Sequence, residues 1–173
     1  HDVSIINQYQ INVIRNHHKK EDFIAFASLT SRDNARSLMQ WDNKPYGGFS
    51  LVKPWNIIGD YRKINVKSQI NNPRSIFAYY QNIIKIRLNP LYKDIFVYGT
   101  YDLILNDHPQ VYAYLRRWEK DTILVLANMK SQKVLLPKLD YQIKSIILSN
   151  YQREFFSQEL LPFEAIVLQI EEE

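Results

Sequence analysis

The feature of the sequence that most constrains the fold is a change of pattern about halfway along its 173 residues. Residues 1–93 carry apolar side chains at helical spacing, interrupted at 31–65 by a predicted long loop that holds most of the glycines. Residues 94–173 consist of short segments rich in β-branched and aromatic residues, separated by turn residues. The chain is therefore predicted to be an α+β protein, helical in its first half and antiparallel β in its second.

Three helices are predicted in the first half. Residues 2–18 form an amphipathic pattern, and a second, short helix begins at Glu21, where an acidic side chain faces the positive end of the helix dipole. Asn72 is a suitable cap for the third helix, and Pro73 is tolerated at a first helical position. This third helix is expected to end before Pro90, because the residue that precedes a proline disfavours helical geometry.

Seven segments in the second half are predicted to be the strands of a small antiparallel sandwich. They are residues 95–98, 101–105, 111–115, 123–127, 133–136, 144–148 and 165–170. So short a β part can bury only a small core.

The composition excludes several classes of protein and site. The absence of Cys rules out disulfides, a Cys nucleophile and thiolate metal sites. No apolar run reaches the length of a membrane span, and the net charge of +4 is spread along the chain rather than gathered as in a nucleic-acid binder. No Gly-rich phosphate loop occurs, and the four His have no metal-binding spacing. We therefore predict no cofactor, no metal, no membrane and no nucleic acid.

One segment, residues 31–42, concentrates the chemistry, with two Arg, two Asp, an Asn, a Gln and a Trp. Arg and Asp form directional bonds to sugar hydroxyls, and an indole offers an apolar face to a pyranose ring. The alternative is a salt-bridged loop in which Arg32 pairs with a neighbour and Trp41 fills a local core. The remaining carboxyls are scattered, so the residues by themselves indicate no complete active site.

Residues 32–42 (RDNARSLMQWD) closely resemble the RDNARTPMQWD signature of the oligo-1,6-glucosidase group, which includes dextran glucosidases and trehalose-6-phosphate hydrolases, within the α-amylase-type family of glycoside hydrolases. Ser37 and Leu38 depart from the usual Thr-Pro, and losing that Pro loosens the loop. Further resemblances follow in the same order, at residues 48–49, 54–55, 61–66, 72–80, 98–101, 111–116 and 161–165.

The resemblance implies that the chain is the C-terminal fragment of a longer enzyme. Residues 1–93 would then be the last part of a catalytic (β/α)₈ barrel, including its signature loop and last helices, and residues 94–173 the C-terminal β-sandwich domain. The family's nucleophile and its acid/base Glu lie upstream, and no position here matches them. We therefore predict no catalytic residue in this chain and expect the isolated chain to be inactive.

The resemblance also implies a substrate-binding role for the signature loop, which reaches the substrate pocket in the family. Arg32 is the first candidate for hydrogen bonds to hydroxyls of the terminal glucose, Arg36 is the second, and Asp33 orients one of the two. Gln40 and Trp41 are expected to lock the loop. Whether Arg32 or Arg36 contacts the sugar stays open.

The predicted function is that of the C-terminal portion of a retaining α-glucosidase that hydrolyses α-1,6 bonds in the cytoplasm. Trehalose-6-phosphate hydrolases and sucrose isomerases are alternatives, because they share the signature. A non-catalytic module that binds carbohydrate or covers the barrel is a further alternative, although Tyr112 and Tyr114 alternate as packing residues do. Expected partners are short α-glucosides and the missing N-terminal barrel segment, and exposed apolar surface on the helical half favours self-association.

Overall fold

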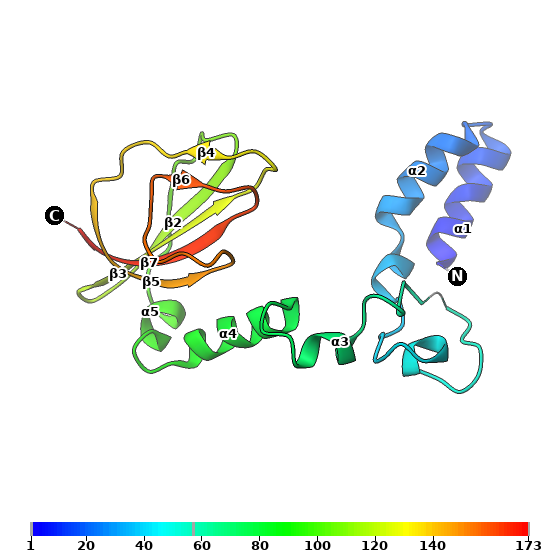
Figure 1. Cartoon of the computed structure of the whole chain (residues 1–173). Coiled ribbons are helices and arrows are strands. Elements are labelled where there is room, and N and C mark those ends of the chain that lie inside the picture. The colour runs from blue at the N-terminus through cyan, green and yellow to red at the C-terminus, as the bar shows by residue number, and fades with distance from the viewer. Residues whose placement is uncertain (1, 57, 173) are drawn as a thin grey trace. The chain divides into compact units, whose positions relative to one another are not determined.

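The structure, a computed structural model, describes residues 2–56 and 58–172. The chain separates into two compact units, residues 1–77 and residues 78–173 (Figure 1). The predicted division between residues 93 and 94 stays a prediction, because the two units are defined by internal contacts rather than by type of structure. Each unit is described by itself.

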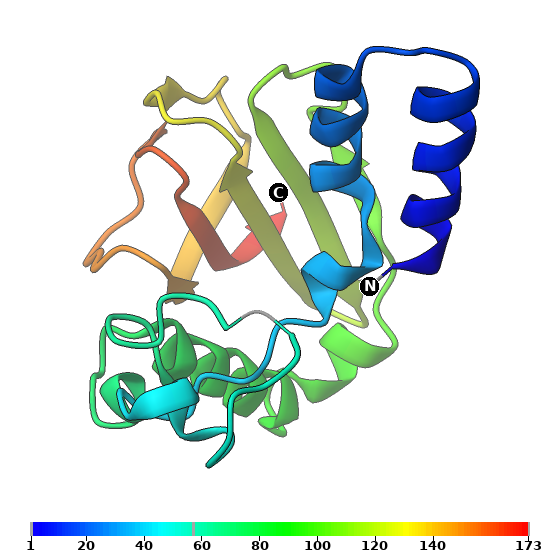
Figure 2. The same cartoon turned by 90° about the vertical axis from the view of Figure 1, so that its right-hand side faces the viewer.

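The first unit begins with two helices that lie side by side (Figures 1 and 2). Helix α1 is Val3–Tyr9, the π-helix η1 is Gln10–Arg15, and α2 is Lys20–Thr30. The predicted single helix over 2–18 is therefore an α-helix that continues as a π-helix and ends before His17, whose φ is 55°. The rings of Tyr9 and Phe23, 5.5 Å apart and nearly perpendicular, join α1 to α2.

The predicted loop that follows contains two short 3₁₀ helices, η2 (Arg32–Ala35) and η3 (Pro45–Gly48), and ends at a helix that the sequence analysis did not predict, α3 (Val66–Ile70). Asn65 caps α3, since its side-chain oxygen accepts a hydrogen bond of 2.9 Å from the backbone N–H of Ser68. The signal for α3 was this single cap residue, because a five-residue helix is too short to display an apolar period.

The third predicted helix is α4 (Ile76–Leu88), and it starts three residues later than expected. The Asn72 carboxamide accepts from the backbone N–H of Arg74 (3.0 Å), and the Asn72 carbonyl accepts from the backbone N–H of Ser75 (3.0 Å). Asn72 thus stabilises a turn around Pro73 instead of capping the helix there.

The first predicted strand, residues 95–98, is wrong, because these residues belong to helix α5 (Lys93–Val97) and its cap. The backbone N–H of Tyr98 donates to the carbonyl of Asp94, which is helical spacing, and Ile95 is buried. A short apolar run fits a buried helical turn as well as a strand, so its periodicity could not separate the two.

The second unit contains a five-stranded antiparallel sheet of order β1-β2-β3-β7-β5 and a two-stranded sheet, β4-β6 (Figure 1). The strands are β1 Asp102–Ile104, β2 Val111–Trp118, β3 Asp121–Asn128, β4 Val134–Leu135, β5 Tyr141–Ser149, β6 Glu159–Leu160 and β7 Ala165–Glu172. Six of the seven predicted segments overlap these strands, so the predicted fold class, helices followed by a small antiparallel β-sandwich, is confirmed.

The core of the second unit lies on one face of the larger sheet, where alternate residues of β2, β3 and β7 point inward. Leu115, Leu124 and Leu168 lie across neighbouring strands, and all three side chains are buried. Leu160 of β6 belongs to the same cluster, so the two-stranded sheet closes this core. In the described part of the first unit, by contrast, Phe23 is the only buried apolar side chain.

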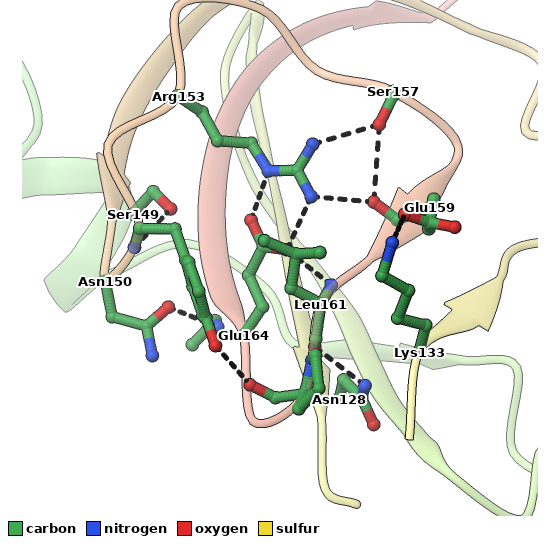
Figure 3. Close-up of polar contacts among 12 residues, drawn as sticks. Asn128, Lys133, Ser149, Asn150, Arg153, Ser157, Glu159, Leu161 and Glu164 are labelled. Atoms are coloured by element: carbon green, nitrogen blue, oxygen red, sulfur yellow. Dashed lines mark hydrogen bonds and ion pairs between the residues drawn. The ribbon is translucent and has the colours of Figure 1, made fainter. Parts of the chain in front are cut away.

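A buried ion pair, Arg153–Glu164, stabilises the segment that runs from β5 through β6 to β7 (Figure 3). The carboxylate of Glu164, which is completely buried, pairs with the Arg153 guanidinium through Nε and Nη2 and also accepts from the backbone N–H of Leu161 at 2.7 Å. Arg153 in addition donates to Ser157 Oγ and to the Glu159 carbonyl, each at 2.9 Å. Because these bonds satisfy both charged groups, the pair is a structural clamp.

Candidate functional site

Two of the predicted substrate-binding residues, Arg32 and Asp33, lie on η2, a single 3₁₀ turn directly after α2, and the third, Arg36, is its C-cap. Ser31 ends α2 with extended backbone, and its hydroxyl accepts a hydrogen bond of 3.3 Å from the backbone N–H of Asp33. This cap turns the chain sharply, so the Arg32 side chain leaves the turn toward solvent and is 62% exposed.

The Arg32 side chain is held by Asp2, a residue that the sequence analysis did not single out. Arg32 Nη2 lies 3.0 Å from Asp2 Oδ1, and the Asp2 side chain is only 4% exposed. The hydrogen bond from this guanidinium, with the one from the backbone N–H of Arg32, holds the pKa of the Asp2 carboxyl far below its ordinary value. The alternative of a salt-bridged loop is therefore met in part: Arg32 forms an ion pair, but with Asp2, which lies outside residues 31–42.

Arg36 and Asp33, the other two predicted binding residues, pair with each other on the same turn. Arg36 Nη1 lies 3.5 Å from Asp33 Oδ1, and half of the Arg36 side chain is exposed. Asp33 therefore forms an ion pair with Arg36, and its charge also attracts the Arg32 guanidinium. All three predicted residues are brought together on one turn, with a solvent-facing guanidinium on each arginine.

The second half of the signature is joined by backbone bonds to the segments that follow it. The backbone N–H groups of Trp41 and Asp42 donate to the Gly47 carbonyl at 2.8 and 3.0 Å, and the Gln40 carbonyl accepts from Val66 at 2.9 Å. Trp41 remains about half exposed, so it does not fill a local core. Gly47 and Gly48 have positive φ values, which the tight turn around them requires.

An open apolar groove of about 400 Å³ runs between α1 and α2. It is lined by Ile5, Ile6, Tyr9, Phe23, Ile24, Ala27 and Ser28. An apolar groove of this kind, next to exposed Phe26 and Leu29, is surface that another protein segment can cover.

A tyrosine cluster, formed by Tyr101 just before β1 and by Tyr112 and Tyr114 of β2, bears on the alternative of a carbohydrate-binding module. The hydroxyls of Tyr101 and Tyr112 are 2.7 Å apart, and the ring of Tyr114 lies 5.1 Å from that of Tyr101 and 5.7 Å from that of Tyr112. The ring of Tyr114 packs against the rings of Tyr101 and Tyr112, and Tyr112 and Tyr114 alternate along β2, as packing aromatic residues do.

Among the residues that the structure describes, no three His, Asp or Glu side chains gather as metal ligands, and no helix is long and apolar enough to cross a membrane. The candidate site consists of the pairs Arg32–Asp2 and Arg36–Asp33 and the backbone of η2.

Family models match nearly the whole chain. The model for the α-amylase catalytic domain matches residues 4–99, and the model for the C-terminal domain of maltogenic amylase matches residues 101–158. The chain belongs to the α-amylase family. The predicted resemblance is thereby confirmed, and the change of family model near residue 100 follows the change from helices to strands.

Relatives within the family are similar to the chain over almost all of its length. The oligo-1,6-glucosidases of Bacillus cereus and Heyndrickxia coagulans are 35% and 37% identical to it, each over 98% of this chain. The trehalose-6-phosphate hydrolase of Bacillus subtilis is 32% identical over 87% of the chain. The chain spans only 31%, 30% and 28% of these three relatives, respectively.

Solved structures agree with this assignment. An isomaltulose synthase mutant from Erwinia rhapontici, in complex with its natural substrate sucrose, matches with a TM-score of 0.88 and 32% identity, over 99% of this chain and 31% of that one. The trehalose-6-phosphate hydrolase of Bacillus licheniformis matches with a TM-score of 0.83 and 31% identity, over 99% of this chain and 32% of that one. The family fold of this C-terminal region is therefore preserved in the chain.

Proposed function

We propose that this chain acts as the C-terminal portion of a retaining α-glucosidase that hydrolyses α-1,6 bonds of isomalto-oligosaccharides. The observation that carries the proposal is the identity of 35% and 37% with two oligo-1,6-glucosidases across 98% of the chain, the signature turn included. Trehalose-6-phosphate hydrolases are somewhat less similar, at 31% and 32% identity. The proposed substrates of the parent enzyme are short α-glucosides.

In this proposal the chain contributes substrate binding and not bond cleavage. Retaining glycosidases use two carboxyl groups about 5 Å apart, one as the nucleophile and the other as acid and base. The rest of the parent enzyme supplies both carboxyls. Arg32 binds hydroxyls of the terminal glucose, and its exposed guanidinium, held at one nitrogen by Asp2, supports this role. Arg36 is the second sugar contact, oriented by Asp33.

The barrel segment that completes the enzyme is the proposed partner of the first unit. Its apolar side chains cover the groove between α1 and α2 in the parent enzyme. Without that cover, the same groove favours self-association of the isolated chain. The proposed location of the parent enzyme is the cytoplasm.

A two-part experiment tests the proposal. The purified chain is expected to release no p-nitrophenol from p-nitrophenyl α-glucoside above a boiled control. A chimera, in which this chain replaces the matching C-terminal region of the Bacillus cereus enzyme, is expected to hydrolyse that substrate and isomaltose. An inactive chimera, or an active isolated chain, would overturn the proposal. A chimera that prefers trehalose-6-phosphate or sucrose would replace the α-1,6 assignment with one of the alternatives.

A further inference from the structure

Asp2 has an unusual position for an acidic residue of the first unit. It is a buried charge in a unit with few buried side chains, and it lies thirty residues before the turn that it contacts. A buried carboxylate is costly unless it is paired and hydrogen-bonded, so the contacts of Asp2 indicate what the position is for.

The two carboxylate oxygens of Asp2 divide their contacts between α1 and η2. Oδ1 accepts from the backbone N–H of Ser4 and from Arg32 Nη2, both at 3.0 Å. Oδ2 accepts from the backbone N–H of Arg32 at 2.9 Å and from the Ser31 hydroxyl at 3.4 Å. One carboxylate therefore caps α1 and binds both the main chain and the side chain of Arg32.

This double contact restrains Arg32 at both ends. The bond to the backbone N–H fixes where the side chain starts, and the bond to Nη2 fixes one terminal nitrogen of the planar guanidinium. A guanidinium carries five N–H donors in a rigid fork, so holding one nitrogen orients the remaining donors. Most of the Arg32 side chain still faces solvent, which leaves those donors accessible to a ligand.

We propose that Asp2 is a positioning residue for sugar binding, whose carboxylate orients the Arg32 guanidinium so that its exposed donors meet the hydroxyls of the terminal glucose. The inference rests on the proposed function, in which Arg32 contacts that glucose. Asp2 itself touches no substrate. An oriented arginine loses less side-chain freedom on binding than a mobile one, so the contribution of Asp2 is to substrate affinity.

A double-mutant cycle in the chimera tests this inference. Asp2→Asn keeps the size of the side chain but removes its charge, and we expect KM for isomaltose to rise about tenfold with kcat nearly unchanged, as loss of one charge-assisted contact would give. In the Arg32→Ala background, Asp2→Asn is expected to have little further effect, because the group that it orients is absent. The matched control is Asp60→Asn, which alters an exposed acid paired with exposed Lys63, and we expect it to leave KM unchanged.

The possible outcomes separate the inference from the function on which it rests. Additive losses in the double variant, or an unchanged KM in Asp2→Asn, would overturn the positioning role while leaving the glucosidase assignment intact. An inactive wild-type chimera would overturn the proposed function and the role of Asp2 with it. Carboxyl NMR titration of the 173-residue chain adds an independent check. If Arg32→Ala does not raise the pKa of Asp2, the contact is absent in solution and the inference fails.

Discussion

The two units of this chain differ in how they bury apolar surface. The second unit encloses its own core, in which Leu124, Leu126 and Leu168 are completely buried. The first unit leaves most of its apolar residues exposed, as with Leu29 at 84%, and its order comes chiefly from caps, turns and backbone bonds. The second unit thus has a core of its own, whereas the described part of the first unit leaves apolar surface uncovered.

Charged pairs follow the same division. Arg153 and Glu164 in the second unit have side chains that are 14% and 0% exposed. The Glu164 carboxylate accepts hydrogen bonds from the guanidinium and from the backbone N–H of Leu161. Arg36 and Asp33 in the first unit are 50% and 23% exposed. Removing Glu164 leaves the buried Arg153 charge without its partner. Removing Asp33 lets water replace it at the exposed Arg36 guanidinium.

The largest expected effect comes from breaking the buried pair. Glu164→Ala should destabilise the second unit by about 3–5 kcal/mol, because the Arg153 guanidinium and the Leu161 N–H lose their acceptor. Arg36→Ala should change the stability of the first unit by about 1 kcal/mol or less. Urea denaturation followed by circular dichroism measures both values. Similar losses for the two variants would contradict the contrast between the units.

Apolar truncation provides the next comparison. Leu168→Ala removes a completely buried side chain of β7 and should cost about 2–5 kcal/mol. Leu29→Ala removes an equally large but exposed side chain of α2, and its cost should stay within about 0.5 kcal/mol. The same denaturation experiment applies, and sedimentation should in addition show weaker self-association for Leu29→Ala. A large loss for Leu29→Ala would mean that the first unit buries this side chain in solution.

The smallest expected effect is a local dependence on pH in the first unit. The pKa of Asp2 lies below its ordinary value of 3.8 in the folded chain, so its contribution is complete above that value and is lost as the pH falls through the folded pKa. Hydrogen exchange of the Arg32 backbone N–H should therefore accelerate as the pH drops below about 4, beyond the intrinsic pH dependence of exchange. Asp2→Asn should remove this extra acceleration, and Asp60→Asn should preserve it. A profile unchanged by Asp2→Asn would show that the carboxylate does not hold the turn.

Much of the second unit could be predicted from sequence because alternation along a half-buried strand is a local pattern. β2 is the clearest case, with buried Val111, Ala113 and Leu115 separated by more exposed residues. β6 has only two residues and so displays no period, and the apolar run of α5 is as short as a strand, so its pattern does not distinguish helix from strand. Local pattern thus identified six of the strands, the short β1 and β4 included, and failed on β6 and α5.

The substrate-binding role of the candidate site stays a prediction, and its geometry could be anticipated only in part. The signature motif identified Arg32, Asp33 and Arg36, which the structure places on one turn. It could not identify Asp2, because nothing in the sequence links an acid at the start of α1 to an arginine thirty residues later. The sequence also does not show that Arg153 pairs with Glu164. Arg153 lies between β5 and β6 and Glu164 between β6 and β7, so their contact depends on how these two loops fold.

The close approach of Gly48 to Asp42 has an evolutionary consequence. A Cβ atom at position 48 would lie 2.6 Å from Asp42 Oδ1, and the φ of +67° already disfavours any other residue. The constraint runs in one direction, because Asp42 can be shortened while Gly48 is kept, whereas a side chain at position 48 would require Asp42 to move or shorten first.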